Sequence, residues 1–268
     1  MNRSDEIRLP EILTLNASAV MQWRRCRREF RTDRILGVPT SDEGPSPDLG
    51  VAVHAMLRQV HETGSCRDRA HVLDVLGAHG FDGPGPLVGY VERHARRCPL
   101  DASWAAHELE LARFHKRPAP MFMTTGRIDA VWIHDGIVDA RDYKTGGNPS
   151  SDRVGDDARA RVQAWLLAER ALRKGLRVRV RYEYLSAEID DDPEPFEPDA
   201  DELAAIEDEL RVVAAEVWKE ENYAGVAERE VCGWCRYRSI CPDSAAPSVA
   251  TWPEPPADDE DEDDPDPA

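Results

Sequence analysis

The chain has 268 residues, 41% of them hydrophobic, and a formal net charge of −18 at pH 7. This length and apolar content fit one sizeable domain or two small ones. No apolar run approaches the length of a membrane span, and residues 1–6 lack the apolar region of a signal peptide. We therefore expect a cytoplasmic protein that does not bind membranes and whose six cysteines do not form structural disulfides.

Hydrophobic periodicity and breaker residues predict an N-terminal helical section followed by an α/β core. Asn16 or Ser18 is the expected N-cap of the first helix. The expected helices cover residues 16–36, 50–63, 68–79, 87–97, 156–174 and 199–221, and the expected strands cover residues 107–114, 125–133, 137–144 and 177–185.

The negative charge is unevenly distributed along the chain. Residues 243–268 hold ten Asp or Glu and no Lys or Arg, which leaves −8 for the other 242 residues. Residues 21–34, by contrast, hold six Arg against two acidic residues. Since the electrostatic footprint of a binding site is local, the net charge does not exclude a nucleic-acid partner. We expect one domain over residues 1–242 and a disordered acidic tail over residues 243–268.

Asp135-Gly136 separates two β-rich runs and predicts a hairpin with a two-residue turn. In that register Asp129 lies opposite Asp142, and Arg127 lies opposite Lys144 on the same face. Opposed side chains have Cβ atoms about 5 Å apart, so two carboxylates there repel unless a cation lies between them. The pattern predicts a divalent-metal site with a lysine beside it. The alternative is a pair of solvated acids, but the apolar residues on the same face indicate that this face is covered.

The spacing of Cys232, Cys235 and Cys241 is C-x2-C-x5-C, in a segment too short to form a core. Three closely spaced thiols in a reducing compartment indicate metal ligation, and they need a distant fourth ligand. Cys26 is the best candidate, with Cys66 and Cys98 as rivals. Iron–sulfur clusters accept such uneven spacing, and zinc is the alternative.

Several motifs, taken together and in this order, resemble the PD-(D/E)XK nucleases of the RecB-like branch. They are Gly50-x-x-x-His54, Gly126-Arg-Ile-Asp129, Asp142-Tyr-Lys144, the Gln163-led helix, and the four cysteines 26, 232, 235 and 241. The iron–sulfur subset of that branch includes the CRISPR-associated adaptation nucleases and the AddB nuclease domain. The resemblance spans residues 15–242 and implies a restriction-endonuclease-like fold, in which a mixed central sheet is flanked by helices and a Cys-rich segment follows.

The resemblance also implies roles for individual residues. His54, Asp129, Asp142 and the backbone carbonyl of Tyr143 would bind Mg²⁺ or Mn²⁺. Lys144 would orient or deprotonate the attacking water, and Gln163 would position Lys144 or a phosphate. Glu108 is a weaker candidate for an outer ligand. Cys26, Cys232, Cys235 and Cys241 would hold a 4Fe-4S cluster. The family usually has Tyr where Leu167 stands, so a contact from that hydroxyl to DNA is in doubt.

Arginines flank Cys26 and are candidate contacts for DNA phosphates: Arg24, Arg25, Arg27 and Arg28. Trp23, Trp234 or Tyr237 could offer stacking surfaces for single-stranded DNA. The alternative is a solvated basic helix with aromatic side chains packed in the core.

The expected function is a metal-dependent DNA exonuclease that acts on single strands or DNA ends in repair or recombination. The chain has no G-x-x-x-x-G-K-[S/T] motif, so the motor of a helicase–nuclease complex would be another chain. The alternative is a non-catalytic DNA-binding or scaffold module of a helicase–nuclease or CRISPR adaptation complex.

Overall fold

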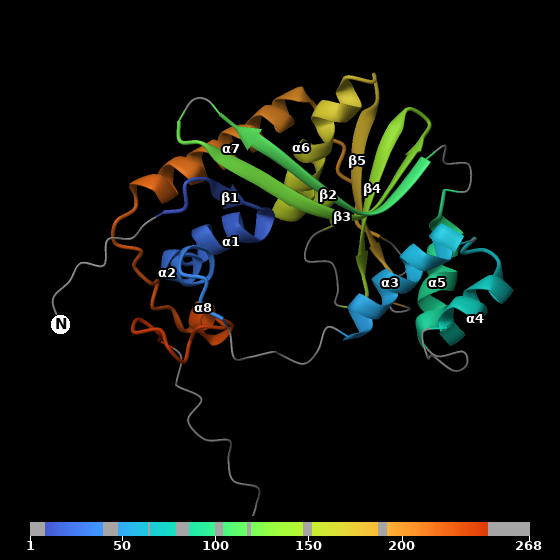
Figure 1. Cartoon of the computed structure of the whole chain (residues 1–268), viewed down its shortest axis with the longest axis horizontal. Helices are drawn as coiled ribbons and strands as arrows, with labels where there is room; N and C mark the ends of the chain where they lie inside the picture. Colours follow the sequence, from blue (N-terminus) through green and yellow to red (C-terminus); the bar gives the residue numbers. More distant parts are fainter. Residues whose placement is uncertain are drawn as a thin grey trace, which may run out of the picture.

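Figure 1 shows the protein as a computed structural model, in which a twisted sheet has helices on both faces. The structure describes residues 9–39, 48–63, 65–78, 86–99, 104–116, 119–146, 152–186 and 192–245. The strands are β1 (Leu13–Leu15), β2 (Trp104–His115), β3 (Phe122–His134), β4 (Ile137–Lys144) and β5 (Arg177–Tyr184). The helices are α1 (Ala17–Arg25), α2 (Arg27–Phe30), α3 (Asp48–Thr63), α4 (Arg69–Ala78), α5 (Pro86–Arg97), α6 (Ala158–Leu172), α7 (Ala200–Lys219) and α8 (Arg229–Gly233).

Strand β3 is the centre of the sheet. Along one edge it pairs with β2, antiparallel, over nearly its whole length. On the other edge β1 pairs parallel with its start, from Phe122 to Thr124, and β4 pairs antiparallel with its end, from Ala130 to His134. Strand β5 completes the sheet by pairing parallel with β4. The sheet is therefore mixed.

The predicted hairpin turn is confirmed, because His134 pairs with Ile137 across Asp135-Gly136. Both turn residues have positive φ, 50° and 72°, as a type I′ turn requires. The ladder ends at Ala130 and Arg141, however, one pair before Asp129 and Asp142. The predicted strand pairing therefore stops before Asp129 and Asp142, and it does not extend to Arg127 and Lys144. Beyond the last pair, β4 separates from β3 and stays paired with β5.

Two cores cover the two faces of the sheet. On one face, Val131, Val138 and Ala140 pack with residues of α1, α6 and α7. On the other, Ala130, Trp132 and Tyr143 pack with residues of α3, α4 and α5. The predicted fold class, a mixed sheet flanked by helices, is confirmed. None of the described helices combines the length and hydropathy needed to cross a bilayer.

The single helix predicted over residues 16–36 is wrong. Asn16 is the N-cap, as predicted, since its side chain accepts a hydrogen bond from the N–H of Ala19 (2.8 Å). The helix ends at Arg25, because Cys26 has an extended backbone with φ −159° and ψ 112°. Helix α2 and a π-helical turn, Arg31–Ile35, follow. Of the predicted acidic tail, residues 246–268 lie outside the described part of the chain.

Candidate active site

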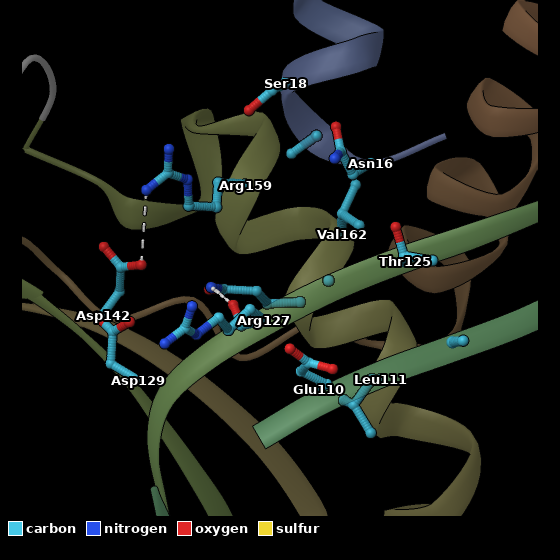
Figure 2. Close-up of a pocket in the computed structure, with 14 residues that line it drawn as sticks. Asn16, Ser18, Glu110, Leu111, Thr125, Arg127, Asp129, Asp142, Arg159 and Val162 are labelled. Carbon is cyan, nitrogen blue, oxygen red and sulfur yellow. Dashed lines mark hydrogen bonds and ion pairs between the residues drawn. The ribbon is translucent and has the colours of Figure 1, made fainter. Parts of the chain in front are cut away.

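A pocket opens where the sheet divides. Strand β1 leaves β3 after Thr124 and β4 joins it only at Ala130, so the β3 edge between them has no strand partner in the described chain. A pocket of about 710 Å³ lies along this opening, and its walls come from β2, β3, β4, α6 and the start of α1. Asp129 and Asp142 line it together (Figure 2).

The two aspartates are held differently. Asp129 Oδ2 accepts a hydrogen bond from the N–H of Tyr143 (2.7 Å), which fixes its carboxylate at the point where the strands part. Asp142 is only 4% exposed. Burial and the nearby charge of Asp129 raise the pKa of Asp142, although Lys144 acts in the opposite direction. A buried carboxylate beside another carboxylate favours a cation between them.

His54 on α3 completes one side of the site. Its Nδ1 lies 3.4 Å from Asp129 Oδ1, and its Nε2 lies 3.2 Å from the carbonyl oxygen of Tyr143. Burial alone would lower the pKa of His54, but the hydrogen bond and charge of Asp129 outweigh it, so that pKa is raised. His54, Asp129 and the backbone of Tyr143, which the resemblance implied as metal ligands, are therefore in direct contact, and Asp142 lines the pocket together with Asp129.

Glu108 on β2 lies closer to this site than the sequence indicated. Ligand atoms of His54, Glu108 and Asp129 all lie within 4.8 Å of one another. Glu108 has φ 53°, and the β2–β3 ladder skips its pairing with Asp129. A non-glycine residue in this left-handed region is strained, and such residues concentrate at functional sites. Carboxylate oxygens with one imidazole form a donor set that suits Mg²⁺ or Mn²⁺.

Two cationic side chains reach Asp142. Lys144 forms an ion pair with it, and the Lys144 Nζ lies 4.3 Å from the ring centroid of Tyr182. Arg159, in the first turn of α6, places Nη1 3.8 Å from Asp142 Oδ1 and lines the pocket (Figure 2). Arg159 was not predicted from the sequence, because its place depends on how α6 packs against the sheet. Its position two residues after the helix N-cap, Asp157, was the available signal.

Gln163 has a different contact from the one predicted. Its Nε2 donates to the carbonyl oxygen of Arg127 (3.0 Å), on the part of β3 that lacks a strand partner. Its Oε1 is buried without a hydrogen-bond partner in the described chain. Gln163 therefore fixes the open edge of β3, and in the described chain its amide bonds to the backbone of Arg127 rather than to Lys144. Leu167 packs in the core with 5% exposure.

Each of the four arginines around Cys26 has an acidic partner. Arg24 pairs with Glu209, Arg25 with Glu29, Arg27 with Glu220 and Arg28 with Asp243. These pairs reduce the positive charge that the sequence suggested for this segment. Trp23 and Tyr237 are buried, at 3% exposure each, so their prediction as stacking surfaces is wrong; Trp234 is 91% exposed.

A second pocket, of about 230 Å³, contains all four cysteines of the predicted cluster. Cys26 lines it between α1 and α2, and Cys232, Cys235 and Cys241 line it from α8 onward. Among the described groups whose ligand atoms lie within 4.8 Å of one another, none contains these cysteines. Cys66 and Cys98, the rival fourth ligands, lie in a separate group with His61 and His94.

Comparisons with known proteins identify the family. The model of the PD-(D/E)XK nuclease superfamily matches residues 14–242, most of the chain. No curated protein matches the sequence. Among solved structures, SSO0001 is 17% identical over 88% of each chain with a TM-score of 0.41. A proposed exonuclease from Eubacterium rectale is 10% identical over 86% of this chain and 89% of its own, with a TM-score of 0.47. The match over residues 14–242 shows that the chain belongs to the PD-(D/E)XK nuclease superfamily.

Proposed function

We propose that this protein is a divalent-metal-dependent DNA nuclease whose active site is the opening between β3 and β4. The observation that carries the proposal is the convergence of His54, Glu108 and Asp129 within 4.8 Å, beside buried Asp142 and its partner Lys144. A cluster of acids alone would be weak support. The family match, the buried carboxylate and the lysine beside it support a catalytic site over a solvated acidic face.

In the proposed site, His54, Asp129, Asp142 and the Tyr143 carbonyl would hold Mg²⁺ or Mn²⁺, with Glu108 as a further ligand. The ion would polarise the phosphate and lower the pKa of a bound water. Lys144 stands beside Asp142 and is placed to orient the water or take up its proton. Arg159 and Arg127 line the same pocket and could hold phosphate oxygens.

We further propose that the protein belongs to the RecB-like branch. We also propose that it is an exonuclease that acts on single strands or DNA ends in repair or recombination. The motifs of that branch support this, since His54, Asp129, Asp142 and Lys144 meet at one site. The proposed domain spans residues 1–242, with the acidic tail outside it.

A 4Fe-4S cluster is proposed for Cys26, Cys232, Cys235 and Cys241, with Zn²⁺ as the alternative. The four cysteines line one pocket, although Cys26 comes from the opposite end of the domain. Zinc sites usually take their ligands from two short pairs, whereas here three cysteines stand close together in sequence and the fourth is distant. Iron–sulfur clusters accept such uneven spacing, which supports a cluster over a single zinc ion.

The test is cleavage of single-stranded DNA labelled at the 5′ or the 3′ end, with Mg²⁺ or Mn²⁺ and full-length protein purified without oxygen. Asp142→Asn should lower the rate by at least about a hundredfold, because it removes a metal ligand worth several kcal/mol. Asp135→Asn is the matched control: it makes the same chemical change at the hairpin turn, where positive φ suits Asn, and should keep wild-type activity.

Inactive wild-type protein that is folded and holds its iron would contradict the proposal. That result would favour a non-catalytic DNA-binding or scaffold module, which the burial of Leu167 in place of the family's tyrosine also supports.

A further inference from the structure

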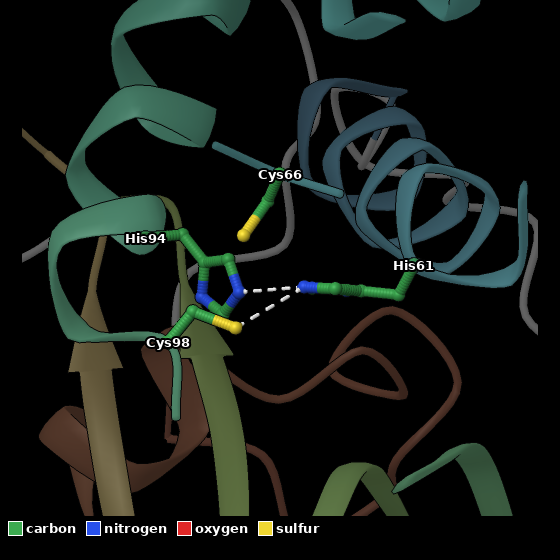
Figure 3. Close-up of side chains that lie close together, drawn as sticks. All are labelled: His61, Cys66, His94 and Cys98. Atoms are coloured by element: carbon green, nitrogen blue, oxygen red, sulfur yellow. Dashed lines mark hydrogen bonds between the residues drawn. The ribbon is translucent and has the colours of Figure 1, made fainter. Parts of the chain in front are cut away.

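A second group of metal-ligand side chains lies on the other face of the sheet, among α3, α4 and α5. It consists of His61 near the end of α3, Cys66 before α4, His94 on α5 and Cys98 just after α5 (Figure 3). One ligand atom from each lies within 4.8 Å of the other three. Three of the four residues are buried, and His61 is half-buried. In sequence they form two short pairs, His-x4-Cys and His-x3-Cys.

The distances within this group fit a tetrahedron around one ion. His61 Nε2 lies 3.1 Å from His94 Nε2 and 3.5 Å from Cys98 Sγ. Zinc bond lengths predict edges of about 3.3 Å between two nitrogens and about 3.6 Å between nitrogen and sulfur. A two-iron cluster with the same ligand types binds the histidines and the cysteines to different irons. The short separation of Cys98 from His61 therefore favours a single ion.

The hydrogen bonds of His94 leave its other nitrogen available. His94 Nδ1 lies 2.7 Å from Glu183 Oε1, and Arg141 Nη1 donates to the other oxygen of Glu183 (2.9 Å). Since Arg141 holds Glu183 as an acceptor, His94 Nδ1 must carry the proton. Its Nε2 faces His61 and the two thiols (Figure 3), so a metal ion bound there would replace the His61–His94 hydrogen bond and the proton that it needs. In zinc sites, a ligating histidine commonly donates a hydrogen bond from its other ring nitrogen to a carboxylate, as His94 does here.

We propose that His61, Cys66, His94 and Cys98 form a structural zinc site, separate from both the active site and the four-cysteine pocket. All four positions of the tetrahedron come from the protein, as in structural rather than catalytic zinc sites. The ion would tie the end of α3 to α5 and, through Glu183 and Arg141, to strands β5 and β4. His54 lies two helical turns before His61 on α3, so the site would hold the helix that carries the candidate catalytic histidine.

The first test is the metal content of full-length protein purified without a histidine tag and without added metal. We expect about one zinc per chain in addition to iron. Cys66→Ser together with Cys98→Ser should lose the zinc and keep the iron. Cys232→Ser together with Cys235→Ser is the matched control, because it changes the same number of thiols and should lose the iron and keep the zinc. Asp129→Asn should also keep the zinc, which separates this site from the active site.

A second measurement identifies the ligands of the bound ion by spectroscopy. Protein with Cys232→Ser and Cys235→Ser, produced with Co²⁺ in place of zinc, should show the visible bands of tetrahedral cobalt and a sulfur-to-cobalt charge-transfer band, because Cys66 and Cys98 remain as thiolate ligands. His61→Cys should keep the metal and strengthen the charge-transfer band. Less than about a tenth of an equivalent of zinc, without these cobalt bands, would overturn the proposal. The proposal would also be overturned if the Cys232→Ser, Cys235→Ser variant lost the zinc while the Cys66→Ser, Cys98→Ser variant kept it.

Discussion

At the scale of single residues, the site depends on how Asp142 is surrounded. Its carboxylate is buried, Asp129 lies beside it, and Lys144 and Arg159 approach it. The two cations partly offset the repulsion between the aspartates, so that both carboxylates can be kept in place before a metal ion binds. Of these two cations, Lys144 is on the same strand as Asp142 and follows it by two residues, whereas Arg159 comes from α6.

Lys144→Met should lower the single-turnover rate of DNA cleavage about 10²- to 10⁴-fold, the usual contribution of a positioned proton donor or acceptor. DNA binding should change little, because Arg127 and Arg159, which line the pocket, keep their positive charge. Lys174→Met, at an exposed position two residues after the end of α6, is the matched control and should leave the rate unchanged. A Lys144→Met rate within about twofold of wild type would remove this residue from the proposed chemistry.

The sequence predicted some of these residues and not others, for a physical reason. Asp129, Asp142 and Lys144 were predicted because a two-residue turn and the two-residue period of strands place them together. Glu108 was predicted only as a weaker, outer ligand, because its position near Asp129 depends on its own left-handed backbone conformation inside β2. Arg159 was missed because its approach depends on packing between α6 and the sheet, which no local pattern encodes.

At the scale of elements, α6 packs closely against the open part of β3. A Cβ added to Gly126 would meet Cδ1 of Leu166 at 2.7 Å, and Leu166 is 5% exposed within the core. The same contact lies next to Arg127, whose carbonyl accepts from Gln163 of α6. Gly126 therefore leaves room for the Leu166 side chain of α6 beside the strand that carries Asp129.

Gly126→Ala should destabilise the protein by about 1–2 kcal/mol, because the new methyl group overpacks a confined contact. Gly89→Ala is the matched control: a methyl group at Gly89 on α5 would meet nothing within 4 Å. That change should stabilise the fold by up to about 1 kcal/mol, the helix-propensity difference between the two residues. Urea unfolding of both variants measures the two effects, and equal midpoints would contradict the close approach.

Hydrophobic periodicity predicted most of the helices and strands, but it did not predict that the first helix is interrupted at Cys26. The run over residues 16–36 has helical periodicity throughout, so local sequence favours one continuous helix. The extended backbone of Cys26 instead places this residue against the pocket that holds the C-terminal cysteines. A contact with residues two hundred positions away overrides the local preference. Strand β1 was also missed, since three residues carry too little pattern to predict a strand.

At the scale of the whole molecule, the two ends of the domain meet at the four-cysteine pocket. Figure 1 shows α8 close to α1 and α2, and the Tyr237 hydroxyl, with its single proton, lies between two acceptors, Asp33 Oδ1 (2.9 Å) and the carbonyl oxygen of Val38 (3.1 Å). Arg28 pairs with Asp243 at the same junction. A metal group held by Cys26 and the later cysteines would close a loop of over two hundred residues. Closing such a loop removes entropy from the unfolded chain and stabilises the fold.

Cys26→Ser should therefore lose most of the iron and lower the unfolding temperature by several degrees, because the link between the ends is removed. Cys66→Ser makes the same replacement of sulfur by oxygen at a cysteine outside the four-cysteine pocket, and it should keep the iron. Iron analysis of both variants, and thermal unfolding of Cys26→Ser beside wild type, all prepared without oxygen, measure these effects. Full iron occupancy in Cys26→Ser would show that Cys26 is not a ligand.

The proposed nuclease needs divalent metal in the opening between β3 and β4, and this binding can be measured with Mn²⁺. Electron paramagnetic resonance of free Mn²⁺, titrated with full-length protein, counts the ions bound per chain. We predict one or two ions for wild type and for Asp135→Asn, and much weaker binding for Asp142→Asn. Equal Mn²⁺ binding by wild type and Asp142→Asn would contradict the claim and place the metal elsewhere.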